Sequence, residues 1–230
     1  MTKLSVNINK IATLRNARGG NKPDLLLMAK DIQLFGAQGI TIHPRPDQRH
    51  ITYNDALNLP EFVNTEFNIE GNPIEKFIDL VCQIKPDQVT LVPDSIDAIT
   101  SNAGWDTIKN KSFLNEVVSE FKNHGIRTSI FVNPDAQMVE GAKACGSDRI
   151  ELYTESYANM FEKNKDQAIK SYIDAAEIAC SCNLEINAGH DLNLLNLSFN
   201  SVKFSILLGF LISKTNEDFS YYHLPNSLQF

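Results

Sequence analysis

The sequence predicts an α/β barrel of eight parallel strands, in which each strand is followed by a helix. Three observations lead to this prediction. Short strand patterns alternate with helical patterns seven times within about 190 residues, and strands separated by single helices must run parallel. Polar residues gather where the strand patterns end, as they do in the TIM (β/α)8 barrel. The alternative, a doubly wound open sheet, would require a glycine fingerprint after the first strand, which this chain lacks.

The expected strands are short and are bounded by turn residues. The first alternates apolar and polar residues, whereas the second is continuously apolar. They lie at residues 4–8, 39–42, 65–71, 88–94, 127–132, 148–154 and 184–190. Each is long enough to cross one sheet and too short for a buried helix.

The expected helices show apolar residues at helical spacing, and several have clear start or stop signals. Pro23 and Asp24 begin the first, and Gly36 and Gly125 each follow the end of a helix. They lie at residues 23–35, 54–59, 73–85, 112–124, 134–144 and 167–180. Residues 9–20 are expected to form a polar loop. Residues 95–106 are expected to form a longer loop, which is more often functional than idle.

The densest group of reactive side chains directly follows the second strand. Two histidines and two arginines lie within eight residues: His43, Arg45, Arg49 and His50. Prolines between them stop the strand and stiffen the segment. Imidazole exchanges protons near neutral pH, and guanidinium binds phosphate with a planar fork of donors. We therefore predict a site for an anionic substrate here, in preference to a solvated basic loop.

Other polar residues also lie at or just past the ends of expected strands: Asn7, Glu70, Thr100, Glu151 and His190. The carboxyl ends of the strands face one end of a barrel, so these side chains are expected to share its mouth. Arg15 and Arg18, followed by Gly19-Gly20, could hold a phosphate. The alternative is structural: salt-bridged carboxylates and a histidine satisfied within a turn.

Composition narrows the class of protein. The chain has 230 residues, 43% of them hydrophobic, and a net charge of −7. The acidic balance argues against nucleic-acid binding, which needs a basic face. The four cysteines, Cys82, Cys145, Cys180 and Cys182, lack metal-site spacing and are expected to be reduced thiols. No signal segment or membrane-spanning run is apparent, so we expect a cytoplasmic protein with one barrel domain over residues 1–230.

Five motifs then point to a known family. They occur in order within residues 3–196: VNINKIATLRNAR at 6–18, HPRPDQRHI at 43–51, NIE at 68–70, LVP at 91–93 and NAGH at 187–190. With these motifs the sequence resembles the pyridoxine 5′-phosphate synthase family, barrel enzymes of vitamin B6 biosynthesis that use no cofactor. The family departs from this chain at Asn9-Lys10, where many members have Asp-His, and at Asp191, which is often glycine.

The resemblance implies a reaction and a role for each matching residue. The family condenses 1-deoxy-D-xylulose 5-phosphate with 3-amino-2-oxopropyl phosphate, releasing phosphate and water. It implies no metal, and it implies an octamer. In the implied catalytic set, His43 and Glu70 are general bases, His190 is the general acid and Glu151 stabilises charged intermediates. The implied substrate-binding residues are Asn7, Asn9, Lys10, Arg18, Arg45, His50, Thr100 and Asp191.

The resemblance ends at Asn196, and residues 197–230 are atypical. The family continues with an eighth strand that ends in a second Gly-His, which binds phosphate and is missing here. Residues 202–212 are expected to lie against the barrel near the first strand, and residues 215–230 to be poorly ordered. Two other functions stay open: an impaired barrel that binds sugar phosphates without turnover, and a metal-dependent hydrolase that uses His43 and His190.

Overall fold

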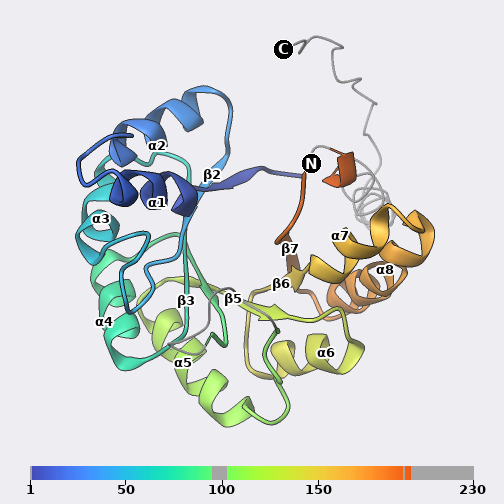
Figure 1. Cartoon of the computed structure of the whole chain (residues 1–230). Helices are drawn as coiled ribbons and strands as arrows, with labels where there is room; N and C mark the ends of the chain where they lie inside the picture. Colours follow the sequence, from blue (N-terminus) through green and yellow to red (C-terminus); the bar gives the residue numbers. More distant parts are fainter. Residues whose placement is uncertain (1, 95–102, 194, 198–230) are drawn as a thin grey trace, which may run out of the picture.

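Seven parallel strands form a single curled sheet in the computed structural model, which describes residues 2–94, 103–193 and 195–197. The strands follow one another in chain order from β1 to β7. In Figure 1 they surround a central space, and the helices lie on the outside. The predicted α/β barrel class is therefore confirmed. The expected eighth strand and the expectations for residues 202–212 and 215–230 fall outside the described residues.

The expected strands are all present, each end within three residues of its prediction. They are β1 (Ser5–Asn7), β2 (Gly39–Ile42), β3 (Glu66–Gly71), β4 (Gln88–Leu91), β5 (Arg127–Val132), β6 (Arg149–Tyr153) and β7 (Glu185–Gly189). The expected helices correspond to α2 (Leu25–Leu34), α3 (Tyr53–Asn58), α4 (Glu75–Ile84), α5 (Lys111–Asn123), α6 (Ala136–Ala144) and α8 (Lys165–Ser181). A short 3-10 helix, η1 (Leu59–Glu61), follows α3. Across the described stretches, no helix combines the length and the apolar character needed to span a membrane.

Two helices occur where none was predicted. The expectation of a loop at residues 9–20 is wrong for most of its length, because residues 9–17 form α1 (Asn9–Ala17). Its buried face consists of only Ala12 and Arg15, too few positions for a clear helical period. α7 (Glu155–Phe161) was missed for the same reason, since Tyr157 and Phe161 are its only buried residues. Both are short helices held by tertiary packing more than by propensity.

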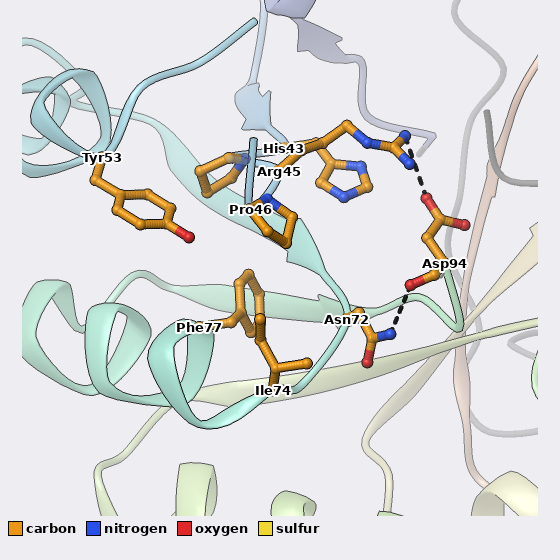
Figure 2. Close-up of a pocket in the computed structure, with 9 residues that line it drawn as sticks. His43, Arg45, Pro46, Tyr53, Asn72, Ile74, Phe77 and Asp94 are labelled. Carbon is orange, nitrogen blue, oxygen red and sulfur yellow. Dashed lines mark hydrogen bonds and ion pairs between the residues drawn. The ribbon is translucent and has the colours of Figure 1, made fainter. Parts of the chain in front are cut away.

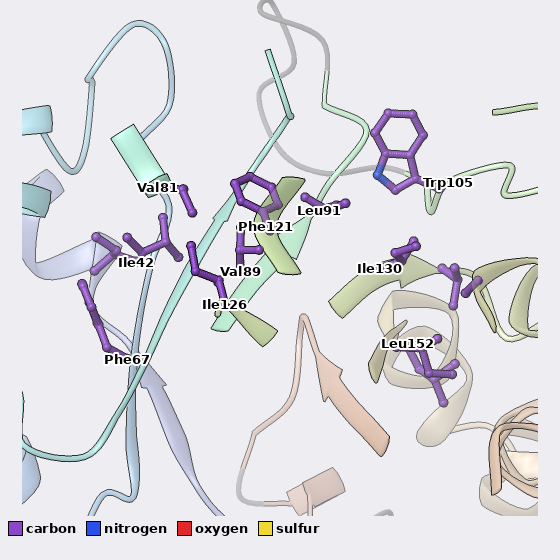
Figure 3. Close-up of a cluster of buried hydrophobic side chains, with 14 of the residues drawn as sticks. Ile42, Phe67, Val81, Val89, Leu91, Trp105, Phe121, Ile126, Ile130 and Leu152 are labelled. Atoms are coloured by element: carbon purple, nitrogen blue, oxygen red, sulfur yellow. The ribbon is translucent and has the colours of Figure 1, made fainter. Parts of the chain in front are cut away.

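The apolar core lies between the sheet and the helices that surround it. Alternate side chains of a strand point to opposite faces, and in β3 the apolar residues Phe67 and Ile69 point outward into this core. Figure 3 shows strand residues such as Val89 and Leu91 close to helical residues such as Phe121. Each fully buried side chain of this size contributes about 1.5–3 kcal/mol. The same alternation leaves the polar residues of each strand pointing into the barrel.

The amino end of the barrel is filled by a network of ion pairs. Its members are the first residues of five consecutive strands: Glu66, Gln88, Arg127, Arg149 and Glu185. Glu66 forms an ion pair with Arg127 at 2.5 Å and accepts a hydrogen bond from Arg149 at 3.2 Å. Arg149 also pairs with Glu185 and donates to Gln88 at 2.8 Å. These contacts link β3 to β7 at the amino end of the sheet.

The first and last strands differ from the strands between them. All four residues of β2 and of β4 are buried, whereas β1 and β7 contain only exposed and half-buried residues. β1 and β7 are the two ends of the sheet, and within the described residues neither has a second strand neighbour. The described sheet therefore has two edges, which stand where an eighth strand would close a barrel.

Candidate active site

The carboxyl ends of the strands bring the predicted catalytic residues to one end of the barrel. His43 directly follows β2, Glu70 lies near the end of β3, and Glu151 lies in β6. His190 directly follows β7. Because Ile42, Ile69 and Ile150 point outward into the core, their neighbours His43, Glu70 and Glu151 point into the barrel. The predicted placement at strand ends therefore holds for His43, Glu70 and His190, whereas Glu151 lies in the middle of β6.

A chain of hydrogen bonds fixes the backbone around His43. The Asn7 side chain at the end of β1 accepts from the backbone N–H of Asn9 at 2.9 Å. The Asn9 side-chain oxygen in turn accepts from the backbone N–H of His43 at 2.9 Å. Asn7 and Asn9 thus join the carboxyl ends of β1 and β2. Asn9 therefore supports the position of His43.

The His43 imidazole is neutral in this environment. His43 is only 9% exposed. Burial, and after it the positive charge of Arg45 and the neighbouring His190, lower the pKa of His43 to about 3, against an ordinary value of about 6.5. A neutral imidazole can accept a proton. An anion bound to the nearby arginines would remove part of the repulsion and make His43 a stronger base.

Glu70 and Glu151 form a pair of carboxyl groups that cannot both ionise easily. Burial and then the negative charges of Glu151 and Asp94 raise the pKa of Glu70 well above its ordinary value. Burial also raises the pKa of Glu151. The pair therefore holds at least one proton near neutral pH, as paired carboxyls do when they share a site. Such a pair can both donate and accept a proton.

Gly189 allows β7 to approach this pair closely. A Cβ atom at position 189 would lie 2.9 Å from the Glu151 carboxylate oxygen Oε1. Any larger residue would push that carboxylate out of its position. The glycine in the NAGH motif is therefore explained by the space that Glu151 occupies.

His190 is held by two aromatic rings at the mouth of the barrel. Its imidazole lies 5.1 Å from the Phe131 ring and 5.2 Å from the Tyr153 ring, measured between centroids. Burial lowers the pKa of His190, while the nearby Asp191 carboxylate opposes this effect. The backbone turns sharply here, since φ is +90° at His190 and +54° at Asp191. Aspartate tolerates this left-handed conformation better than most residues, and glycine adopts it freely.

Arg45 is buried beside an acidic residue that the sequence did not single out. Its guanidinium lies 3.5 Å from the Asp94 carboxylate, and the two side chains are 7% and 6% exposed. The Asn72 amide donates to the backbone oxygen of Asp94 at 2.6 Å. Figure 2 shows both contacts, with the His43 ring next to the Arg45 side chain. Asp94 follows the end of β4, so the strand-end rule could have identified it.

A second network anchors the loop that carries Arg45 and His50. The His50 ring nitrogen Nδ1 lies 2.8 Å from the Thr13 hydroxyl, and this hydroxyl donates to the Asn9 carbonyl oxygen. Because the Thr13 hydroxyl proton is already donated to Asn9, the His50 Nδ1–H is the donor in the contact between His50 and Thr13. Nearby, Arg15 binds both carboxylate oxygens of Asp55 at 2.6 and 2.8 Å. Arg15 is therefore engaged within the protein, and the proposed phosphate role for it is not supported by this geometry.

The remaining predicted binding residues that the structure describes are exposed on the surface. Lys10 is exposed, and its positive charge is near enough to lower the pKa of His50. Arg18 is exposed at the end of α1, about 13 Å along the helix from Asn9. Asp191 is exposed beside His190. Thr100 lies outside the described residues.

The metal-binding alternative finds no support at the barrel mouth. In the described part of the chain, the metal-ligating side chains whose donor atoms converge are Cys82, Glu120 and His124. That group includes neither His43 nor His190. The mouth instead contains proton-transfer groups and arginine, which suit general acid–base chemistry on an anionic molecule.

Comparison with known proteins gives the family. A family model described as "Pyridoxal phosphate biosynthesis protein PdxJ" matches residues 4–205. Pyridoxine 5′-phosphate synthase of Cytophaga hutchinsonii is 61% identical over 230 residues, covering 100% of this chain and 97% of the relative. The synthase of Flavobacterium johnsoniae is 66% identical over 199 residues, covering 86% of this chain and 84% of the relative.

A solved structure supports the fold independently. Dihydropteroate synthase from Thermus thermophilus superposes with a TM-score of 0.52 at 12% identity, covering 92% of each chain. At this identity the likeness concerns the barrel fold alone. The family match extends over most of the chain, and the two relatives share well over half of their residues with it. This chain belongs to the PdxJ family of pyridoxal phosphate biosynthesis proteins.

Proposed function

We propose that the chain is a pyridoxine 5′-phosphate synthase. It condenses 1-deoxy-D-xylulose 5-phosphate with 3-amino-2-oxopropyl phosphate to pyridoxine 5′-phosphate, phosphate and water. The observation that carries the proposal is the grouping of His43, Glu70, Glu151 and His190 at one end of the barrel, in a chain with such close relatives. Imine formation, enolisation and elimination are all proton transfers, and these four groups titrate.

The charges at the mouth of the barrel suggest a role for each of these four side chains in the proton-transfer steps. His43, neutral and buried, accepts the first proton. Glu70 acts as the second base once its own proton has left. A protonated imine would lower the pKa of both glutamates, because a cation between two carboxyls favours their ionised forms. Glu151 would then stabilise that cation, and His190 would return a proton to the leaving oxygen.

Two arginine-containing regions would hold the two phosphates. Arg45 and His50 lie on the loop after β2, and they would bind the phosphate of deoxyxylulose phosphate together with Thr100. The Arg45–Asp94 contact of 3.5 Å is long for an ion pair, so a phosphate dianion could compete for the guanidinium. Asn7 and Arg18, with Asn9, Lys10 and Asp191 near the mouth, would bind the amino-ketone phosphate.

The proposal includes an assembly and a location. We propose a homo-oligomer, an octamer as in the resembling family, in the cytoplasm. Exposed apolar side chains on and after α2 support a contact with another chain: Leu27 is 53% exposed, Leu34 81% and Phe35 85%. Large apolar side chains exposed together are a common feature of protein interfaces.

The activity is tested directly with the purified protein and both substrates. Chromatographic separation of pyridoxine 5′-phosphate, with phosphate release measured in parallel, should show product formation. His43→Ala and Glu70→Gln should each lower turnover by at least about a hundredfold, the usual contribution of one general base. Glu116→Gln, an exposed carboxylate on α5, is the matched control and should leave turnover unchanged.

A second function, an impaired barrel that binds sugar phosphates without turnover, has one observation in its favour. The residues after Asn196 contain no second Gly-His, although the family model matches to residue 205 and the Cytophaga hutchinsonii relative aligns over all 230 residues. Calorimetry decides between the two. Heat of binding with 1-deoxy-D-xylulose 5-phosphate, combined with no product from folded protein, would replace the synthase proposal with the binding function.

A further inference from the structure

A group of three metal-ligating side chains lies on the outside of the barrel, away from the mouth. Cys82 comes from the last turn of α4, Glu120 from α5, and His124 is the residue that ends α5. Both helices lead into the amino ends of strands, β4 and β5. Figure 1 shows α4 and α5 next to each other on the outer surface. The group therefore lies toward the amino end, opposite the catalytic residues.

The donor atoms are close enough together to share one ion. The Cys82 sulfur lies 3.7 Å from the His124 Nδ1 atom, and a Glu120 carboxylate oxygen lies 3.5 Å from the same nitrogen. All three donor atoms lie within 4.8 Å of one another. In a tetrahedral zinc site, the bond lengths require about 3.6 Å between sulfur and nitrogen and about 3.3 Å between nitrogen and oxygen. Two edges of the required tetrahedron are thus nearly present.

Local structure explains why the three side chains converge. Glu120 and His124 are four residues apart on α5, so they lie on the same face of the helix. α4 packs beside this face and presents Cys82, which is half-buried. The Glu120 side chain is 49% exposed and that of His124 is 33% exposed. An ion can therefore reach the group from solvent without any movement of the barrel.

We propose that Cys82, Glu120 and His124 form a binding site for Zn²⁺ or a similar borderline-soft divalent cation. One sulfur, one nitrogen and one oxygen ligand suit such ions, whereas Mg²⁺ and Ca²⁺ prefer oxygen ligands alone. Three protein ligands leave the fourth position for water. The bound ion joins the carboxyl ends of α4 and α5.

Binding requires two local changes. In the structure, His124 Nδ1 lies 3.0 Å from the Glu120 carbonyl oxygen and donates to it. With a metal bound, Nδ1 becomes a ligand and the ring proton moves to Nε2. The hydrogen bond from Nδ1 to the Glu120 carbonyl oxygen is then lost. The Cys82 thiol must also lose its proton, although burial and the carboxylates of Glu120 and Asp79 raise its pKa. A coordinated metal ion removes thiol protons readily.

Cobalt is the probe that reports on these ligands. The full-length protein, freed of metal by a chelator, is titrated with Co²⁺ and then with Zn²⁺. We expect one equivalent of Co²⁺ per chain, with a thiolate-to-cobalt charge-transfer band and the intense visible bands of tetrahedral cobalt. Zn²⁺ should remove both spectra. Thermal unfolding in Zn²⁺ should occur at a higher temperature, because only the folded chain has the site assembled.

Three variants identify the site. Cys82→Ser should lose the charge-transfer band, and Glu120→Gln should bind at least about tenfold more weakly. Glu120 is half exposed, so this variant keeps the fold intact even if a change at Cys82 disturbs packing. Cys182→Ser, at a half-buried cysteine that ends α8, is the matched control and should keep the full spectrum.

Four results would overturn the proposal. Three of them are the absence of a charge-transfer band in the wild type, its survival in Cys82→Ser, and equal affinity of Glu120→Gln and the wild type. Loss of the band in Cys182→Ser would assign the metal to a different thiol, and it would overturn the proposal equally.

Discussion

The two ends of the barrel interior use the same kinds of charged residue in opposite ways. At the amino end, Arg127 and Arg149 contact Glu66, and Arg149 also contacts Glu185. Each charge there has a partner of opposite sign. At the carboxyl end, by contrast, Glu70 is near the acidic residues Glu151 and Asp94. Alternation along a strand thus places a charged residue inside the barrel, and the charges of its neighbours decide whether it is structural or reactive.

The difference has a thermodynamic consequence. Paired charges at the amino end stabilise the folded chain relative to leaving either partner alone. Groups of like charge at the carboxyl end must stay neutral against their ordinary tendency, which destabilises the fold. A site with shifted pKa values is therefore held in place by the rest of the barrel. Substitutions at the two ends should consequently change stability in opposite directions.

The largest effect is expected from Arg149→Met at the amino end. The substitution leaves Glu66 and Glu185 without this partner in a partly buried network, and it should lower the free energy of unfolding by about 3 kcal/mol. Urea unfolding at neutral pH measures it. Lys122→Met, which removes an exposed ion pair with Asp148, is the control and should cost less than about 1 kcal/mol. Equal losses in the two variants would mean that the network has no special role.

A smaller effect is expected from His43 as the pH falls. Because the pKa of His43 is lowered to about 3, the unfolded chain takes up a proton below about pH 6.5 that the folded chain cannot. The wild type therefore loses stability as the pH falls, by about 2 kcal/mol between pH 6.5 and 5. In urea unfolding, the free energy of unfolding of His43→Gln should fall by about 2 kcal/mol less than that of the wild type over the same pH interval. Parallel curves for the two proteins would show that His43 is not held neutral.

A still smaller gain in stability is expected from Glu70→Gln at higher pH. The raised pKa of Glu70 means that the folded chain keeps a proton that the unfolded chain releases above about pH 4.3. Stability attributable to this group is therefore lost as the pH rises. In thermal unfolding, the variant should be more stable than the wild type near pH 8 and equally stable near pH 4. A variant that is less stable at every pH contradicts the account.

The smallest effect is expected from Gly189→Ala. The added Cβ would lie 2.9 Å from a Glu151 oxygen, and moving one flexible carboxylate should cost about 1 kcal/mol or less. Turnover should fall more than stability, because the displaced group is the proposed stabiliser of the charged intermediate. Steady-state kinetics and thermal unfolding of the same preparation test this. Unchanged turnover would indicate that the exact position of Glu151 is unimportant.

Much of the fold could be predicted because the alternation of strand and helix is strong in this sequence. The ends of β2 and β5 match their predictions to the residue. The placement rule for strand ends also holds for His43, Glu70 and His190, whereas Glu151 lies in the middle of β6. The short helices α1 and α7 could not be predicted, since each buries only two residues and is set by its tertiary neighbours.

Contacts between distant segments account for what the sequence left out of the site. Asp94 could be placed at a strand end from the sequence, but its contact with Arg45, which follows a different strand, could not be predicted. His190 could be placed at the mouth, but not against Phe131 and Tyr153. Cys82 and His124 are 42 residues apart, so no spacing motif could show that their side chains meet. In each case, the spacing of residues along the chain does not show which side chains of different helices and strands come into contact.

Infrared spectroscopy can detect the proton that we expect the carboxyl pair of Glu70 and Glu151 to hold while no ligand is bound. The carbonyl stretch of a protonated carboxyl group is measured at neutral pH in protein labelled with ¹³C-glutamate. We expect a label-sensitive band of this kind, which is lost in Glu70→Gln and kept in Glu116→Gln. A wild-type spectrum without the band at neutral pH, where it appears only near the ordinary glutamate pKa of about 4.3, would contradict this expectation.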